Sequence, residues 1–217
     1  MRAIVLPVKS LVEAKSRLDP LLTPLERGAL TLAMLEDVMD AAQAVPGWET
    51  WVVSPDEAVL EIALRRRAEA IEEETPTLTA AIQQVEEEAS GRAVGALAIL
   101  LADTPMVTTA ALTRALRTLG PVVIAPAADE VGTNLLLRRP PTAIQARFGA
   151  DSYRRHLQAA AESDLPTAVV EEPALAFDVD AADDILTVLE TRKPGRTLEV
   201  CRDLDLGGRI VADARRH

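Results

Sequence analysis

The stretch Arg2-Ala3-Ile4-Val5-Leu6-Pro7-Val8 is a continuous apolar run, and it decides the fold class. A strand of a parallel sheet is buried on both faces and is therefore apolar throughout, whereas a half-exposed strand alternates apolar and polar residues. Similar runs recur at residues 51–53, 96–101 and 122–124. They predict a set of buried strands.

Helical patterns separate these runs. Thr23-Pro24-Leu25-Glu26 has the form of a capping box with proline at the first helical position, and apolar residues follow it at helical spacing. Further helices are predicted at residues 57–66, 78–89, 108–119 and 152–161, and further strands at 133–138 and 167–171. Alternating strands and helices predict an α/β fold, with a mostly parallel, Rossmann-like central sheet and helices on both faces.

The length and composition predict a single domain. With 217 residues and 48% hydrophobic content the chain can bury a large core. We expect a domain over residues 1–192, with residues 193–217 forming a short helix and a polar tail that pack on this domain or extend from it. No run approaches the roughly 20 apolar residues of a membrane span, and the N-terminus lacks a signal-peptide pattern, so we expect a cytoplasmic protein.

The charge is strongly acidic but unevenly distributed. A formal net charge of −11 argues against a nucleic-acid partner. Two of the three lysines, Lys9 and Lys15, lie with Ser16 and Arg17 in one segment after the first strand. This segment is a candidate anion site, with a solvated loop as the alternative, and it lacks the GxxxxGK[ST] pattern of a Walker-type NTPase.

The sequence Phe177-Asp178-Val179-Asp180 places two carboxylates where the apolar run from Leu175 predicts that a buried strand continues. Side chains two apart on a strand share a face, so both carboxylates should point the same way. Two like charges side by side favour a bound cation. The alternative is that both cap the helix predicted from Ala181 onward.

Asp103 is a second acidic position. It ends the apolar run of residues 97–102 and precedes Thr104-Pro105, so it should lie at the carboxyl edge of the sheet, where α/β proteins bind ligands. If it faces Asp178 and Asp180, three carboxylates converge. Oxygen ligands alone favour a hard cation, and Mg²⁺ is expected where phosphates complete the shell. An aspartate that merely begins a loop is the alternative.

Two glycine-containing segments could form a second pocket. Gly132-Thr133-Asn134 precedes a strand, and Gly149 precedes a helix that begins near Ser152. Glycine allows close backbone approach and a helix N-terminus binds anions, although turns and caps explain each piece equally well. His156 lies four residues beyond Ser152 and could line this pocket or be purely structural.

Taken together, these motifs resemble the guanylyltransferases of coenzyme F420 biosynthesis, which act on 2-phospho-L-lactate or phosphoenolpyruvate. The resemblance runs nearly end to end and rests on Pro7-Val8-Lys9, Ala14-Lys15-Ser16-Arg17-Leu18, Ala102-Asp103-Thr104-Pro105, Gly132-Thr133-Asn134, Phe148-Gly149 with Ser152 and His156, and Phe177-Asp178-Val179-Asp180 with Asp183-Asp184. Thr77-Leu78-Thr79 and Asp129-Glu130-Val131 depart from the family pattern.

The resemblance implies a nucleotidyltransferase fold of the nucleotide-diphospho-sugar transferase type, and GMP transfer from GTP to a phosphorylated three-carbon acid. It implies Mg²⁺ binding by Asp103, Asp178 and Asp180, which with Lys15 would be the catalytic set. It implies contacts with the GTP phosphates by Lys9, Lys15, Ser16 and Arg17. It implies contacts with the acceptor by Thr133, Gly149 and Ser152.

Phosphoenolpyruvate is the first expected acceptor, with 2-phospho-L-lactate and 3-phosphoglycerate as alternatives. A sugar-phosphate or molybdopterin nucleotidyltransferase is a rival interpretation, but Leu6-Pro7-Val8-Lys9 lacks the expected glycine-rich loop. A non-catalytic nucleotide-binding protein and a purely structural domain also stay open, as does a homodimer.

Overall fold

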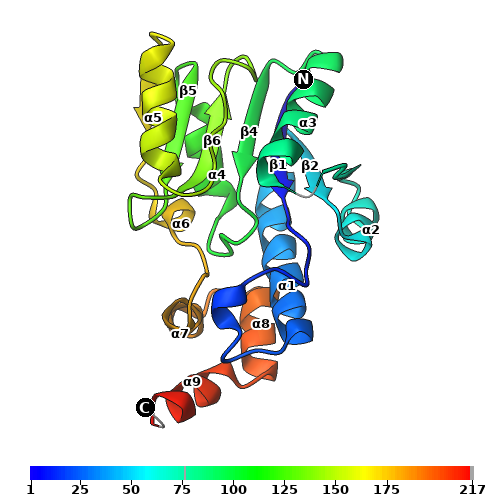
Figure 1. Ribbon diagram of the computed structural model, residues 1–217, viewed down its shortest axis with the longest axis vertical. Coiled ribbons are helices and arrows are strands. Elements are labelled where there is room, and N and C mark those ends of the chain that lie inside the picture. The colour runs from blue at the N-terminus through cyan, green and yellow to red at the C-terminus, as the bar shows by residue number, and fades with distance from the viewer. Residues whose placement is uncertain (76, 216–217) are drawn as a thin grey trace.

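The computed structural model describes residues 1–75 and 77–215, and it contains one seven-stranded sheet with the strand order β3-β2-β1-β4-β6-β5-β7 (Figure 1). The strands are β1 (Arg2–Pro7), β2 (Glu49–Ser54), β3 (Glu69–Glu72), β4 (Ala96–Leu100), β5 (Val122–Pro126), β6 (Thr133–Arg138) and β7 (Thr167–Val169). All neighbours pair in parallel except β6, which runs antiparallel between β4 and β5. The predicted mostly parallel α/β sheet is confirmed.

Helices cover both faces of this sheet, as predicted. They are α1 (Pro24–Gln43), α2 (Glu57–Arg65), α3 (Leu78–Gly91), α4 (Thr109–Arg117), α5 (Ser152–Glu162), α6 (Pro173–Ala176), α7 (Ala182–Thr191), α8 (Arg196–Asp203) and α9 (Leu206–Ala214). Buried residues of α1, α2 and α4 share one core, and those of α3 and α5 share the core on the opposite face. Within the described residues, no helix has the length and apolar character needed to span a membrane.

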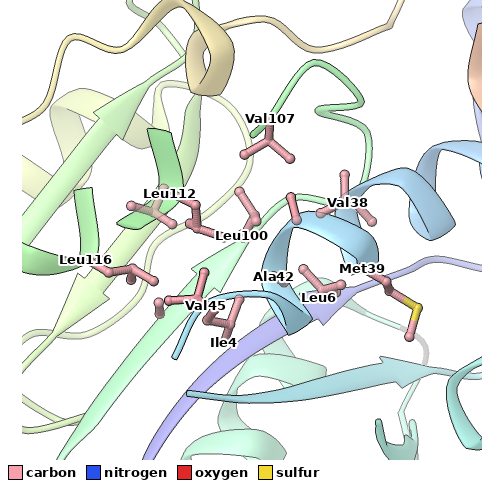
Figure 2. Packing of buried hydrophobic residues seen from close by; sticks show 14 of the residues in the cluster. Ile4, Leu6, Val38, Met39, Ala42, Val45, Leu100, Val107, Leu112 and Leu116 are labelled. Atoms are coloured by element: carbon pink, nitrogen blue, oxygen red, sulfur yellow. The ribbon is translucent and has the colours of Figure 1, made fainter. Parts of the chain in front are cut away.

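The alternation of β1 side chains between the two cores explains its continuous apolar sequence. Ile4 and Leu6 pack with Val38 of α1 and Leu100 of β4 (Figure 2). Val5 points to the opposite face and joins the core that contains α3 and α5. Because both faces are covered, a polar residue at any of these positions would be buried without water.

A third apolar cluster lies beyond the carboxyl ends of the parallel strands, where Figure 1 shows α7, α8 and α9 gathered below the sheet. It joins Leu18 of the loop after β1, Met34 of α1, Val179, Ile185 of α7 and Cys201 of α8. The cluster therefore fixes the basic loop and the acidic segment at the same edge of the sheet.

The prediction of a strand leading into Asp178 is wrong. Pro173 begins the four-residue helix α6, and residues 177–180 follow it as an extended segment outside the sheet. Local composition did not reveal this, because Leu175 is buried against the sheet core as a strand residue would be.

Two other elements differ from the prediction. Strand β3, at the edge of the sheet, was missed because its sequence Glu-Ala-Ile-Glu is half-exposed and lacks an apolar run. The C-terminal segment contains two helices, α8 and α9, instead of one short helix and a polar tail, and its positions 216 and 217 lie outside the described residues. The division at residue 192 stays a prediction.

Asp37 of α1 fixes the start of α8. Its buried carboxylate accepts hydrogen bonds from the backbone N–H groups of Arg196 (2.8 Å) and Thr197 (2.9 Å) and from the Thr197 hydroxyl (2.6 Å). A Cβ at Gly195 would lie 2.7 Å from Asp37 Oδ2, so only glycine leaves room for this contact. Asp37 thus caps α8 from another helix.

We expect Asp37→Ala to lower the free energy of unfolding by about 2–3 kcal/mol, because three donors at a buried helix terminus lose their acceptor. Urea unfolding measures the change. Asp40→Ala is the matched control, since Asp40 is 52% exposed and its pairs with Arg66 and Arg196 should contribute at most about 1 kcal/mol. Equal losses in the two variants would contradict the capping role.

Candidate functional site

Three carboxylates meet at the carboxyl edge of the sheet. Asp103 lies in the loop after β4, and Asp178 and Asp180 lie between α6 and α7. One oxygen atom from each carboxylate lies within 4.8 Å of the other two. The backbone explains the convergence: Val179 N–H donates to the carbonyl of Asp103 at 3.0 Å, and the Val179 side chain is fully buried. Val179 thereby points inward, and its two acidic neighbours face Asp103.

The side chains of Asp178 and Asp180 do not cap α7. The helix has no side-chain cap, and the carboxylate of Asp184 in its first turn accepts hydrogen bonds from the backbone N–H groups of Asp180 (2.8 Å) and Ala181 (2.7 Å), which precede it. The helix-cap alternative is therefore wrong for both side chains. Their carboxylates stay available for contacts on the sheet side.

Lys15 connects two of the three carboxylates. Its Nζ atom lies 2.6 Å from Asp103 Oδ2 and 2.8 Å from Asp180 Oδ1, and its side chain is only 8% exposed. The residue has left-handed backbone geometry, with φ at 54°, immediately before the 3₁₀ turn Ser16–Leu18. Arg17 is largely exposed and reaches Asp180 Oδ2 at 3.3 Å. Lys9 and Ser16 are exposed on the same loop.

Arg27 of α1 holds this loop in place, and the sequence analysis missed it. Its guanidinium is buried and donates to the carbonyls of Ala14 (3.1 Å) and Leu22 (3.2 Å), and it also pairs with Asp19. These contacts flank Lys15 on both sides. The available signal was an arginine at helical spacing from Leu30 and Met34 of the buried face.

Burial and charge separate the acidities of Asp178 and Asp180. Burial raises the pKa of Asp178 to about 6, and the charges of Asp103 and Asp180 add to the increase. The hydrogen bond from Asn134 acts in the opposite direction and lowers this pKa. Burial also acts to raise the pKa of Asp180, but Lys15 and the other basic groups outweigh it and hold that pKa below its ordinary value. Lys15 compensates Asp180 better than it compensates Asp178.

Asn134 is a second residue whose role the sequence analysis missed. It is buried at the start of β6, and its Nδ2 atom lies 3.0 Å from the carbonyl oxygens of both Leu175 and Ala176 and 3.2 Å from Asp178 Oδ1. It therefore ties the end of α6 to the sheet and orients Asp178. The motif Gly132-Thr133-Asn134 was the signal.

Thr133 is joined to His156 of α5. Nε2 of His156 accepts a hydrogen bond from Arg147 N–H at 2.8 Å, and burial followed by nearby arginines lowers the pKa of His156 to about 3. The imidazole is therefore neutral, with its proton on Nδ1, which donates to Thr133 Oγ1 across 3.0 Å. The hydroxyl hydrogen of Thr133 is left to donate to another group.

Gly149 and Ser152 lie at the N-terminus of α5, next to this pair. Gly149 has φ at +99°, a conformation that strains residues with a Cβ. Ser152 is the first residue of α5 and is buried. Strand β6 links the two groups of site residues, since Thr133 contacts His156 and the next residue, Asn134, contacts Asp178.

The acidic residues fit a divalent cation. Asp103 Oδ1 is buried and has no hydrogen-bond partner among the residues that the structure describes. An unpaired buried carboxylate oxygen is costly, and a cation held by this oxygen would remove that cost. All the available ligands are oxygen atoms, which hard cations such as Mg²⁺ prefer. Metal binding by these residues stays a prediction.

The acidity of Asp178 leads to a pH-dependence prediction. A cation binds the ionised carboxylate, so below pH 6 protons compete with it, and Mn²⁺ affinity should fall by about tenfold per pH unit. Above pH 6 the affinity should level off. Asn134→Ala removes the hydrogen bond that lowers this pKa and should move the midpoint to higher pH. Mn²⁺ titrations between pH 5 and 7.5 measure it, and a flat profile would contradict the assignment.

The chain is similar to known guanylyltransferases in sequence. The family model described as "Guanylyl transferase CofC like" matches residues 1–209. A phosphoenolpyruvate guanylyltransferase of Rubrobacter xylanophilus is 40% identical over 83% of this chain and 90% of its own length. A 3-phospho-D-glycerate guanylyltransferase of Phenylobacterium zucineum is 35% identical over 94% of this chain and 97% of its own length.

Solved structures agree on the fold. A protein of Desulfovibrio desulfuricans G20, named as a candidate nucleotide-diphospho-sugar transferase, has a TM-score of 0.78 at 18% identity, over 94% of this chain and 96% of that one. A nucleotidyl transferase of Methanothermobacter has a TM-score of 0.65 at 16% identity, over 88% of this chain and 97% of that one. The predicted nucleotidyltransferase fold is confirmed, and the chain belongs to the family of CofC-like guanylyl transferases.

Proposed function

We propose that this protein transfers GMP from GTP to the phosphate of phosphoenolpyruvate and releases pyrophosphate, as a step of coenzyme F420 biosynthesis. The observation that carries the proposal is the convergence of Asp103, Asp178, Asp180 and Lys15 at the carboxyl edge of the sheet. The names of relatives that are 32–40% identical to this chain support the substrates.

The proposed chemistry divides among the chain's own groups. An oxygen of the acceptor phosphate attacks the α-phosphorus of GTP, a new P–O–P linkage forms, and the bond to the leaving pyrophosphate breaks. The acceptor phosphate is already anionic at neutral pH, so the protein needs only to position the reactants and neutralise charge. Mg²⁺ held by the three aspartates would supply part of that neutralisation, and Lys9, Lys15 and Arg17 would supply the rest.

Pyrophosphate release by the purified protein tests the proposal. GTP and Mg²⁺ are supplied with phosphoenolpyruvate, 2-phospho-L-lactate or 3-phosphoglycerate, and the acceptors are ranked by kcat/KM. 3-Phosphoglycerate belongs in the set because two relatives, 35% and 32% identical, are named 3-phospho-D-glycerate guanylyltransferase. Phosphoenolpyruvate should rank first. If no acceptor leads to pyrophosphate release, the proposal is wrong.

The rival interpretation, a non-catalytic nucleotide-binding protein, predicts a different result. GTP affinity would then be independent of Mg²⁺, whereas the proposed enzyme should bind GTP more tightly with the metal present. Isothermal titration with and without Mg²⁺ separates the two. A homodimer stays a prediction, for which sedimentation velocity is the measurement.

Thr133 is proposed to donate its free hydroxyl hydrogen to the acceptor. We expect Thr133→Val to raise KM for phosphoenolpyruvate by about tenfold, since one hydrogen bond to a charged group is lost, while KM for GTP is unchanged. Thr133→Ser retains the hydroxyl and serves as the control. Steady-state kinetics with each substrate varied in turn measures the effect, and a larger change for GTP would contradict this role.

A further inference from the structure

Lys15 occupies the place where a cation would neutralise the acidic cluster. Its ammonium group contacts Asp103 Oδ2 and Asp180 Oδ1, and these contacts bridge segments far apart in the sequence. The side chain is almost completely buried, so it is held in the cluster and is not a mobile surface lysine. In this structure the positive charge of Lys15 neutralises part of the acidic cluster.

The individual oxygen atoms show which carboxylate is most affected. Asp103 retains one buried oxygen that has no hydrogen-bond partner within residues 1–75 and 77–215. Asp180 has Lys15 on Oδ1 and Arg17 on Oδ2, so each of its oxygens already has a cationic partner. A cation therefore competes with Lys15 and Arg17 for Asp180, whereas Asp103 Oδ1 is open to it with Lys15 in place.

We propose that Lys15 couples cation binding to nucleotide binding: it holds Asp180 in the nucleotide-free protein, and the triphosphate of GTP draws it away so that the cation gains Asp180. The triphosphate competes for the ammonium group with the two carboxylates that hold it, because it carries more negative charges than Asp103 and Asp180 together. Cation and nucleotide then each favour the binding of the other, as linkage requires. The inference rests on the proposed metal-dependent function.

The experiment measures binding of Mn²⁺ without nucleotide, by electron paramagnetic resonance of the free ion. Lys15→Met should bind Mn²⁺ at least about tenfold more tightly than the wild type, which corresponds to about 1.4 kcal/mol. Lys9→Met is the matched control. It removes the same charge from the same loop, but Lys9 is exposed and acts on Asp180 only at a distance, so its affinity should rise by less than about threefold. Asp180→Asn in the Lys15→Met protein should remove the gain.

A second measurement uses the wild type alone, so that it does not depend on the folding of a variant. Crystals soaked with Mn²⁺ and GTP, without acceptor, should show Lys15 Nζ beyond hydrogen-bonding distance of Asp180 and close to the triphosphate. Lys15 still bonded to Asp180 in that complex would overturn the inference, as would an equal gain in the Lys15→Met and Lys9→Met proteins. If neither the wild type nor Lys15→Met binds Mn²⁺ in any condition, both this inference and the proposed function fail.

Discussion

Asp178→Asn is expected to lower the rate of pyrophosphate release by at least about 10³-fold, because the variant would lose one of the three anionic oxygen ligands proposed for the catalytic cation. The substitution conserves the size of the side chain, and the asparagine Oδ1 atom can still accept the hydrogen bond from Asn134. The loss should therefore reflect charge and not shape. Stopped assays of pyrophosphate with GTP and phosphoenolpyruvate measure it.

The same substitution should not destabilise the fold. The pKa of Asp178 in the folded protein, about 6, lies above the ordinary value of 3.8, so folding favours the protonated form. The favourable contribution is present at low pH and is lost as the pH rises through 6, so at pH 7 the ionised carboxylate opposes folding. An asparagine removes that opposition, and the melting temperature at pH 7 should equal or exceed that of the wild type.

A matched control separates this effect from a general loss of negative charge. Asp183→Asn makes the same chemical change five residues further along, at an exposed position in the first turn of α7. Its turnover should stay within about twofold of the wild type, because an exposed charge outside the site is screened. Wild-type turnover in Asp178→Asn, or an equal loss in Asp183→Asn, would remove the metal hypothesis.

Lys15→Met should lower kcat/KM for GTP by about 10²- to 10³-fold, since in the proposed reaction a positioned positive charge on the phosphates would be lost from the transition state. The same protein should bind Mn²⁺ more tightly than the wild type. Tighter metal binding together with slower turnover distinguishes a specific effect of the substitution from unfolding. An unfolded variant would show neither tight metal binding nor a normal melting curve. Steady-state kinetics with GTP varied, together with thermal unfolding, measures the result.

Lys9→Met is again the comparison for Lys15→Met. Lys9 is exposed, whereas Lys15 is buried against two carboxylates. Removal of the Lys9 charge should therefore raise KM for GTP by only about three- to tenfold and leave kcat nearly unchanged. If the two lysines had equal effects on kcat, the special position of Lys15 would be wrong.

The sequence predicted most of the sheet because burial on both faces leaves a local signature. The runs at β1, β4 and β5 are apolar throughout and are fully buried except for Arg2. The capping box of α1 is equally local, and so is the helical pattern of α4, which begins at the threonine pair where the helix over residues 108–119 is predicted. Strand β3 was not predicted, because a half-exposed strand at the edge of a sheet does not need an apolar run.

The acidic residues of the candidate site could also be named from the sequence, but their surroundings could not. Asp103 lies at the end of an apolar run, and Asp178 and Asp180 interrupt another, so each is recognisable as a charged residue where the local pattern predicts an apolar one. Whether their side chains capped α7 was undecidable from spacing alone. In the structure neither side chain caps α7, and Asp184 in its first turn accepts instead from the backbone N–H groups of Asp180 and Ala181.

The amino-acid sequence by itself determined the α/β class, the strands that both cores bury, and the residue types that can bind phosphate and a hard cation. These depend on the side-chain pattern within a few turns of chain. Only the tertiary structure decided that β6 runs antiparallel, that residues 177–180 leave the sheet, and that Lys15 lies against Asp180, 165 residues away. Such contacts depend on how distant elements pack. The third apolar cluster and the buried Arg27 place the basic loop beside the acidic segment, and no local sequence pattern predicts that contact.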